Sequence, residues 1–247
     1  MVKYEHPLPA ASFVGSRNQA LLRLCEGRTV LHLGFVDEGL LEDRLQHQNW
    51  LHAELTRVAA RVVGVDISVE GVRRAQEVGF SDCYAGDVEK LSQAAFPRLN
   101  YDIILAADII EHVANPGLFL SELQAVAGED TVVVITTPNA LSIKTFFFPL
   151  ARTEAVHSDH NFYYSPTTLT TLLRKYGFRV TGIDLYSGVW VRNRQKSHRV
   201  GELVAKSLFT ALDAVLRYSV VLLFPYYSEG MLIRARKRDG AEGPDSR

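Results

Sequence analysis

Two short runs decide the fold of this chain: Val30-Leu31-His32-Leu33-Gly34 and Arg61-Val62-Val63-Gly64-Val65-Asp66. Continuous apolar runs of this length are typical of parallel strands that are buried on both faces of a sheet. Apolar side chains recur at helical spacing between the two runs, from Leu40 to Ala60, and Ser68 begins a further helix that Gly79 ends. The order is therefore strand, helix, strand, helix.

The same alternation continues along the chain. We expect further strands at 82–84, 101–106, 131–136, 178–186 and 230–236, and helices at 88–96, 115–126 and 165–177. Repeated units of this kind predict an α/β fold, a Rossmann-like doubly wound sheet with helices on both faces. The last two strands are expected to pair as an antiparallel hairpin around a helical insertion at about 187–228. We predict a single domain over 1–239 and a disordered polar tail at 240–247.

Composition narrows the class of partner. The chain has 247 residues, 47% of them apolar, which fits one α/β domain. Its 27 basic and 28 acidic residues leave a net charge of −1, so we expect a small-molecule partner and no nucleic acid. Cys25 and Cys83 lack the spacing of a zinc-thiolate site, and two cysteines are too few for a disulfide framework, which fits a reducing compartment.

We expect a cytoplasmic protein without a membrane span. Residues 1–11 are too polar and too interrupted by prolines for a secretory signal. The charge-free stretch at 218–228 is about half the ~20 residues that a spanning helix needs. The amphipathic pattern at 200–224 predicts a long helix, which either packs as one more core helix or serves a homodimer contact or a substrate cap.

Two carboxylates follow strand ends, the places where open parallel sheets bind ligands. Asp66 follows the second strand, where a carboxylate can accept hydrogen bonds from both hydroxyls of a ribose. Asp87 follows the third strand, where it either accepts from an exocyclic amine such as that of adenine or caps the helix that begins at Val88. One side chain can also do both.

Together these features resemble class I S-adenosylmethionine-dependent methyltransferases, over about residues 27–186 and 229–236. The corresponding segments are Val30 to Gly34, Val65-Asp66, Gly86-Asp87, Tyr101 to His112 and Thr137-Pro138-Asn139. The resemblance implies seven strands in the order 3-2-1-4-5-7-6, with the last strand antiparallel, and S-adenosylmethionine as the cofactor. The cofactor-binding residues that it implies are His32, Gly34, Asp37, Asp66, Ile67, Asp87, Val88, Ala107 and Asp108.

The first motif departs from the family pattern. His32 stands in place of an acid, Val36 and Glu38 occupy later glycine positions, and only Gly34 and a shifted Gly39 remain. The ribose acid follows roughly ten residues later than such motifs require, so a longer connection is expected before it. Either a subfamily holds the methionine end of the cofactor with this connection, or the chain is a non-catalytic, methyltransferase-like binding protein.

The segment Asp108-Ile109-Ile110-Glu111-His112 points to the chemistry. Its polar members are expected on one side of a helical turn, beside the methyl group. In some members that methylate hydroxyls an acid-x-x-Glu-His group binds a divalent cation, which implies Asp108, Glu111, His112 and His160, or His157, as ligands. Without a metal, the predicted catalytic residues are His112, His160 and Glu111, with an imidazole as general base. The alternative is that Glu111 and His112 fix the turn and support the cofactor pocket.

The segment at 139–164 is rich in aromatic residues, and a loop of this length is usually functional. We expect it to form part of an acceptor pocket with Arg152, His157 and His160 as polar contacts; the alternative is that its phenylalanines pack on the sheet. The stretch at 157–166 resembles bacterial members that modify glycans or natural products, so the expected reaction is O-methylation of a sugar, glycan or natural-product hydroxyl. A nicotinamide-dependent oxidoreductase fits less well, because the glycine triplet is missing.

Overall fold

The computed structural model describes residues 5, 7–37, 39–154, 156–187 and 219–238. The strands are β1 (Ser12–Val14), β2 (Thr29–Leu33), β3 (Arg61–Asp66), β4 (Cys83–Ala85), β5 (Ile103–Ala107), β6 (Val132–Pro138), β7 (Phe178–Tyr186) and β8 (Gly230–Lys237). The α-helices are α1 (Arg17–Cys25), α2 (Leu41–His47), α3 (Leu51–Val58), α4 (Val69–Glu77), α5 (Pro116–Val126), α6 (Ile143–Phe147) and α7 (Pro166–Lys175). Short 3-10 helices are η1 (Val88–Gln93), η2 (Phe148–Ala151) and η3 (Pro225–Tyr227).

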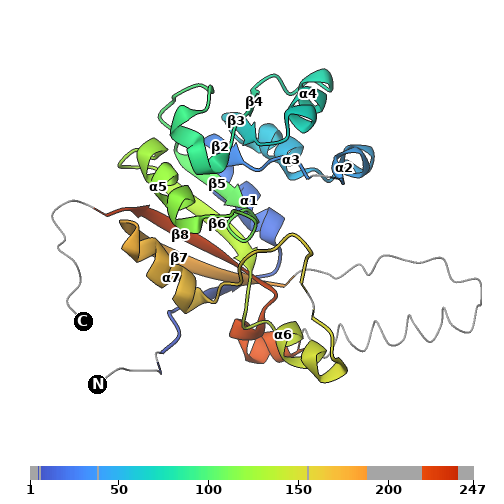
Figure 1. Cartoon of the computed structure of the whole chain (residues 1–247), viewed down its shortest axis with the longest axis vertical. Coiled ribbons are helices and arrows are strands. Elements are labelled where there is room, and N and C mark those ends of the chain that lie inside the picture. The colour runs from blue at the N-terminus through green and yellow to red at the C-terminus, as the bar shows by residue number, and fades with distance from the viewer. Residues whose placement is uncertain (1–4, 6, 38, 155, 188–218, 239–247) are drawn as a thin grey trace, which may run out of the picture.

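The strands form one sheet in the order β1-β7-β8-β6-β5-β2-β3-β4 (Figure 1). Strands β2 to β8 therefore follow the predicted order, with β8 antiparallel to both β6 and β7 and the other pairs parallel. The prediction of seven strands is wrong by one, because β1 adds a parallel strand at the edge beside β7. Its three residues are too few to show the alternation by which a strand is recognised in a sequence.

The sheet is buried on both faces, as the apolar strand runs predict. In β5, Ile103 and Leu105 pack in a core with α1 and α3, while Ile104 between them packs in the larger core with α5 and α7. This alternation is the two-residue period of a strand, and it assigns the helices to two layers around the sheet. No helix among the described residues is both long and apolar enough to span a bilayer.

Local signals set several element ends where the sequence places them. Asn115 and Ser165 cap α5 and α7, and each helix has proline at its start. The expected single helix over 40–60 is instead two helices, because Gln48 adopts a left-handed conformation with φ of 53° and ends α2. The segment at 139–164 contains α6 and η2 instead of an extended loop.

Part of the chain that carries predictions lies outside the described residues. These are residues 188–218, which hold most of the predicted insertion and of the 200–224 helix, and the tail from 239 onward. The flanking prediction is confirmed, since β7 and β8 pair antiparallel on either side of that insertion. The domain boundaries and the homodimer contact through the 200–224 helix stay predictions.

Candidate functional site

A cavity of about 970 Å³ opens at the carboxyl ends of β2, β3 and β5. This is the end of an open parallel sheet at which ligands bind, and the volume is that of a cofactor site. All nine residues predicted to bind the cofactor line the cavity: His32, Gly34, Asp37, Asp66, Ile67, Asp87, Val88, Ala107 and Asp108. The rule that strand ends meet at one edge of the sheet therefore accounts for the convergence of these residues on one cavity.

Gly34 joins the turn after β2 to the turn after β5. Its φ is +62°, and a Cβ atom at this position would lie 1.8 Å from Cδ1 of Ile109. Its N–H donates to the carbonyl oxygen of Val65 at 2.9 Å. Both the backbone conformation and the close contact require glycine here, so the motif keeps the one glycine that its geometry demands.

Asp66 is buried at the end of β3, and its carboxylate organises the backbone around the cavity. One oxygen accepts from the N–H of Val36 at 2.8 Å, and the other accepts from the N–H of Ser68 at 2.9 Å. Val36 stands at a position where the family has glycine, yet its backbone N–H still reaches the carboxylate. The missing glycine therefore does not remove this backbone contact.

Asp87 serves as the N-cap of η1, where its side chain accepts from the N–H of Glu89 at 2.9 Å. The capping alternative is thus confirmed. Because Asp87 also lines the cavity, the cap does not exclude the predicted contact with a ligand amine.

The longer connection between β2 and β3 places a second histidine beside the one that replaces the acidic residue of the motif. His52 of α3 lies with its Nδ1 3.2 Å from the Nδ1 of His32, and its Nε2 lies 3.5 Å from the sulfur of Cys83. The rings of Phe35 and Trp50 pack against His52 with centroids 4.6 and 5.1 Å away. Burial lowers the pKa of His32 well below its usual value and that of His52 to about 4. Both imidazoles are therefore neutral near pH 7.

Arg17 is a site residue that the sequence did not reveal. It comes from the first turn of α1, lines the cavity and forms an ion pair with Asp108. Asp108 also accepts from the hydroxyl of Thr136 at 2.7 Å. Nothing in the local pattern around Arg17 distinguishes it from a surface arginine; only the packing of α1 beside β2 and β5 brings it to the cavity.

Glu111 lies below the cavity and does not line it. Its side chain is buried, and among the described residues neither carboxylate oxygen has a hydrogen-bond partner of ordinary geometry, although the hydroxyl of Thr137 lies close enough to favour the charged carboxylate. The buried hydroxyl of nearby Tyr164 also has no such partner in this part of the chain. Burial is the largest cause that raises the pKa of Glu111, to about 7. The carbonyl oxygen of Glu111 accepts from the N–H groups of Asn161 and Phe162 at 2.7 and 3.2 Å. These contacts agree with the alternative in which Glu111 supports the turn.

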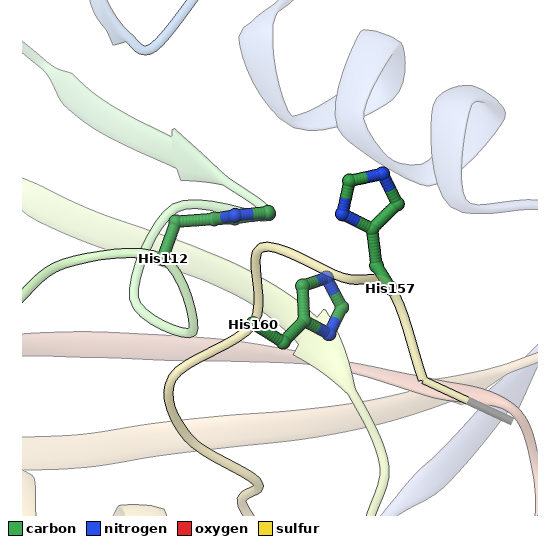
Figure 2. Close-up of side chains that lie close together, drawn as sticks. All are labelled: His112, His157 and His160. Carbon is green, nitrogen blue, oxygen red and sulfur yellow. The ribbon is translucent and has the colours of Figure 1, made fainter. Parts of the chain in front are cut away.

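Three histidines converge at the mouth of the cavity (Figure 2). His112 comes from the turn after β5, and His157 and His160 come from the segment that crosses it; one nitrogen of each ring lies within 4.8 Å of the others. Of these, His112 and His157 line the cavity and His160 does not. The Nδ1 of His112 lies 3.2 Å from a carboxylate oxygen of Asp159.

The predicted metal ligands are not brought together as a set. In the part of the chain that the structure describes, the group whose ligand atoms converge is His112, His157 and His160, without Asp108 or Glu111. The reason is backbone geometry, because Asp108 has a φ of +54° and so does not continue a helical turn with the residues after it. Its carboxylate pairs with Arg17, and that of Glu111 is buried.

Some residues of the aromatic segment at 139–164 line a cavity, and others pack in the core or are exposed. Phe148, Arg152 and Tyr163 line a smaller cavity of about 410 Å³ beside η2. Tyr164 instead packs in the larger core, and Phe147 and Phe162 are exposed. The structure therefore gives Arg152 and His157 cavity positions, in two different cavities. The expected packing of the segment's phenylalanines on the sheet does not hold for Phe147 and Phe162, which are exposed, and the buried aromatic residue is Tyr164 instead.

Comparison with known proteins agrees with this architecture. A family model described as a methyltransferase domain matches residues 46–182, more than half of the chain. A ubiquinone biosynthesis O-methyltransferase of Rhodopseudomonas palustris is 31% identical over 124 residues, which cover 50% of this chain and 45% of the relative. The corresponding protein of Azorhizobium caulinodans is 29% identical over 140 residues, covering 55% and 49%. The chain thus spans about half the length of the curated relatives it matches.

Solved structures share the fold at low identity. A methyltransferase from Archaeoglobus fulgidus described as SAM-dependent superposes with a TM-score of 0.54 at 19% identity, covering 90% of this chain and 91% of that one. Magnesium protoporphyrin IX methyltransferase from Synechocystis PCC 6803, with SAH bound, gives a TM-score of 0.55 at 12% identity, covering 89% and 81%. At these identities the likeness concerns the fold alone.

Proposed function

Because the chain belongs to the methyltransferase-domain family of the class I, S-adenosylmethionine-dependent type, we propose that it methylates a hydroxyl oxygen of a small molecule. The observation that carries the proposal is the cavity at the sheet switch point, where Asp66, Gly34 and Arg17 converge. These residues fit the cofactor: an acid for ribose hydroxyls, a glycine turn that allows close approach, and a cation for the methionine carboxylate.

In this proposal, different residues of the cavity bind the ribose, the adenine and the methionine part of the cofactor. Asp66 accepts from the ribose hydroxyls, and Asp87 accepts from the adenine amine. Arg17, held by its ion pair with Asp108, faces the methionine carboxylate with a planar set of donors. His32 is neutral, so it contributes a ring nitrogen and no charge where related enzymes carry an acid.

Catalysis depends on alignment and on removal of one proton. When bound, S-adenosylmethionine supplies a sulfonium methyl group, which the acceptor oxygen takes as the carbon–sulfur bond breaks. The cavity walls hold the reacting groups in line, which supplies much of the rate. The acceptor's proton is lost at the histidines of the cavity mouth, where His112 lies on the wall. Glu111 supports this turn from below, as a positioning residue.

The acceptor is a small molecule with a hydroxyl group. The names of the O-methyltransferase relatives support oxygen as the acceptor atom, and they add ubiquinone-type precursors to the sugar, glycan and natural-product hydroxyls that the sequence suggests. The net charge of −1 supports a small acceptor over nucleic acid. A cytoplasmic location is also part of the proposal, because two cysteines without a disulfide framework fit a reducing compartment.

Isothermal titration with S-adenosylmethionine and S-adenosylhomocysteine tests the cofactor site. Asp66→Ala should weaken both affinities by about 10- to 100-fold, because it removes charge-assisted hydrogen bonds. Asp82→Ala is the matched control, since Asp82 is paired with Arg61 outside the cavity. Absence of binding by the unmodified chain would contradict the enzyme and favour a non-catalytic binding protein.

A turnover assay on panels of quinol, sugar and natural-product acceptors then tests the reaction. His112→Ala should lower turnover about 100-fold while S-adenosylhomocysteine affinity stays unchanged. His47→Ala, a change at an exposed His–Asp pair on α2, is the control. Unchanged turnover in the His112 variant would refute its role.

A further inference from the structure

Of the three histidines at the cavity mouth, His112 and His157 have hydrogen-bond partners, whereas His160 has a ring nitrogen without one. The rings of His112 and His160 lie with centroids 4.6 Å apart, and those of His157 and His160 lie 5.4 Å apart. The Nδ1 of His112 contacts the Asp159 carboxylate, and the Nδ1 of His157 accepts from the backbone N–H of Asp159 at 3.3 Å. Within the described part of the chain, the buried Nδ1 atom of His160 has no hydrogen-bond partner. A buried, unsatisfied polar atom is unfavourable unless a ligand completes it.

Burial and the neighbouring imidazoles favour the neutral form of His160. Three protonated imidazoles so close together would repel one another, and burial, followed by His112 and His157, lowers the pKa of His160. Neutral imidazole is the form that coordinates metal ions. The buried pair of His32 and His52 offers a contrast, because aromatic rings pack around it and, among the described residues, it does not belong to a converging group of three ligand atoms.

We propose that His112, His157 and His160 bind one divalent transition-metal ion of the zinc type. Imidazole suits Zn²⁺, Fe²⁺ and Co²⁺ better than it suits Mg²⁺. Metal–nitrogen bonds of about 2.0 to 2.1 Å place tetrahedral ligand atoms about 3.4 Å apart. The present spacing of up to 4.8 Å closes to that value by rotation of side chains, two of which belong to a surface segment.

Asp159 orients one of the proposed ligands without binding the ion itself. Its carboxylate engages the Nδ1 of His112, which leaves Nε2 as the coordinating atom and fixes the ring. Glu111 is not a ligand, because its carboxylate is buried beneath the turn. The ligand set is therefore three imidazoles, in place of the mixed carboxylate and imidazole set that the motif suggests.

The use of this ion rests on the proposed function, although its binding does not. Three protein ligands leave one coordination position, and His112 and His157 both face the cavity. A cation there stabilises the oxyanion of a bound acceptor hydroxyl, whose proton passes to solvent water; with the ion present, the imidazoles act as ligands and no longer as the proton acceptor. The ion thus selects acceptors whose hydroxyl oxygen reaches the cavity mouth.

Two titrations of a chain without a histidine tag test the inference. Binding of Co²⁺ is measured by visible absorption, and binding of Zn²⁺ is measured by calorimetry. We expect one ion per chain and a tetrahedral Co²⁺ spectrum. His157→Ala and His160→Ala should each weaken binding at least tenfold. His47→Ala, with its exposed His–Asp pair, should bind the ion like the unmodified chain.

A further variant fixes the ligand set. Glu111→Gln should retain the affinity for Co²⁺; a tenfold loss in this variant, with S-adenosylhomocysteine binding intact, would overturn the three-imidazole site. Absence of stoichiometric Co²⁺ and Zn²⁺ binding would overturn the inference altogether. Because S-adenosylhomocysteine binding is measured separately, failure of the metal site is distinguishable from failure of the proposed function.

Discussion

Among the described residues, histidines form two clusters, one beside the glycine turn at Gly34 and one at the cavity mouth. His32 and His52 are 2% and 1% exposed, stacked, and surrounded by aromatic rings. His112, His157 and His160 are partly or fully accessible and come from segments far apart in the sequence. The surroundings of an imidazole therefore decide whether it serves in packing or can bind a ligand. The first cluster completes the packing beside the cavity, and the second is accessible at the cavity mouth.

The variant expected to change cofactor affinity most lies at the contact between the glycine turn after β2 and the turn that leads to His112. Gly34→Ala places a Cβ against Ile109, on the turn that leads to His112, and forces an unfavourable φ. We expect S-adenosylhomocysteine affinity to fall 100-fold or more, a loss of about 3 kcal/mol, measured by calorimetry.

Gly27→Ala provides the matched control. Gly27 has a similar φ of +67° but no heavy atom within 4 Å of the added Cβ. Its replacement should lower the melting temperature without changing affinity. Equal loss of affinity in both variants would mean that backbone strain, and not the contact between the regions, governs the site.

The second prediction concerns the buried pair His32 and His52 and the pH dependence of the free energy of unfolding. Unfolded histidine binds a proton near pH 6.5, whereas folded His52 does so only near pH 4. Below pH 6.5 the unfolded state therefore holds more protons, and the free energy of unfolding falls as the pH falls. Between pH 7 and pH 5 this one group should cost about 2 kcal/mol of stability.

Denaturant titrations at the two pH values measure this loss. His52→Gln should remove about that share of the pH dependence, even if its stability is lower throughout. His47→Gln, on the exposed face of α2, should leave the dependence unchanged. An unaltered pH dependence in the His52 variant would show that the buried cluster does not resist protonation.

The smallest effect concerns how the open cluster is held in place. The side chain of Asn161 donates to the carbonyl oxygen of His112 at 2.8 Å and ties the crossing segment to the turn. Asn161→Ala should cost about 1 kcal/mol of stability and lower turnover severalfold, with cofactor affinity retained. A parallel loss of cofactor affinity would show that the two regions are not separable at this point.

Much of the fold was predictable because its signals are local. The Asn115-Pro116 pair specifies the start of α5, and apolar strand runs specify β3 and β7. That the nine predicted residues line one cavity was predictable, because strand ends in a parallel sheet meet at one edge.

The rest depends on contacts between distant segments. Arg17 reaches the cavity only through the packing of α1, and His157 reaches His112 only through the path of a long segment. The predicted metal set failed because it assumed helical spacing from Asp108, whose left-handed backbone changes the direction of its side chain. Such a conformation is uncommon outside glycine and is not indicated by the sequence.

Strand β1 has a consequence for solubility. It covers β7 only from Asp184 to Tyr186, at the edge of the sheet. The remaining edge of β7 carries exposed Arg179 and a bulge between Val180 and Gly182, two features that discourage pairing with another chain. Three residues near the N-terminus therefore protect the end of β7 that has no bulge, and loss of this short strand would leave the backbone groups of that edge unpaired, as a template for aggregation.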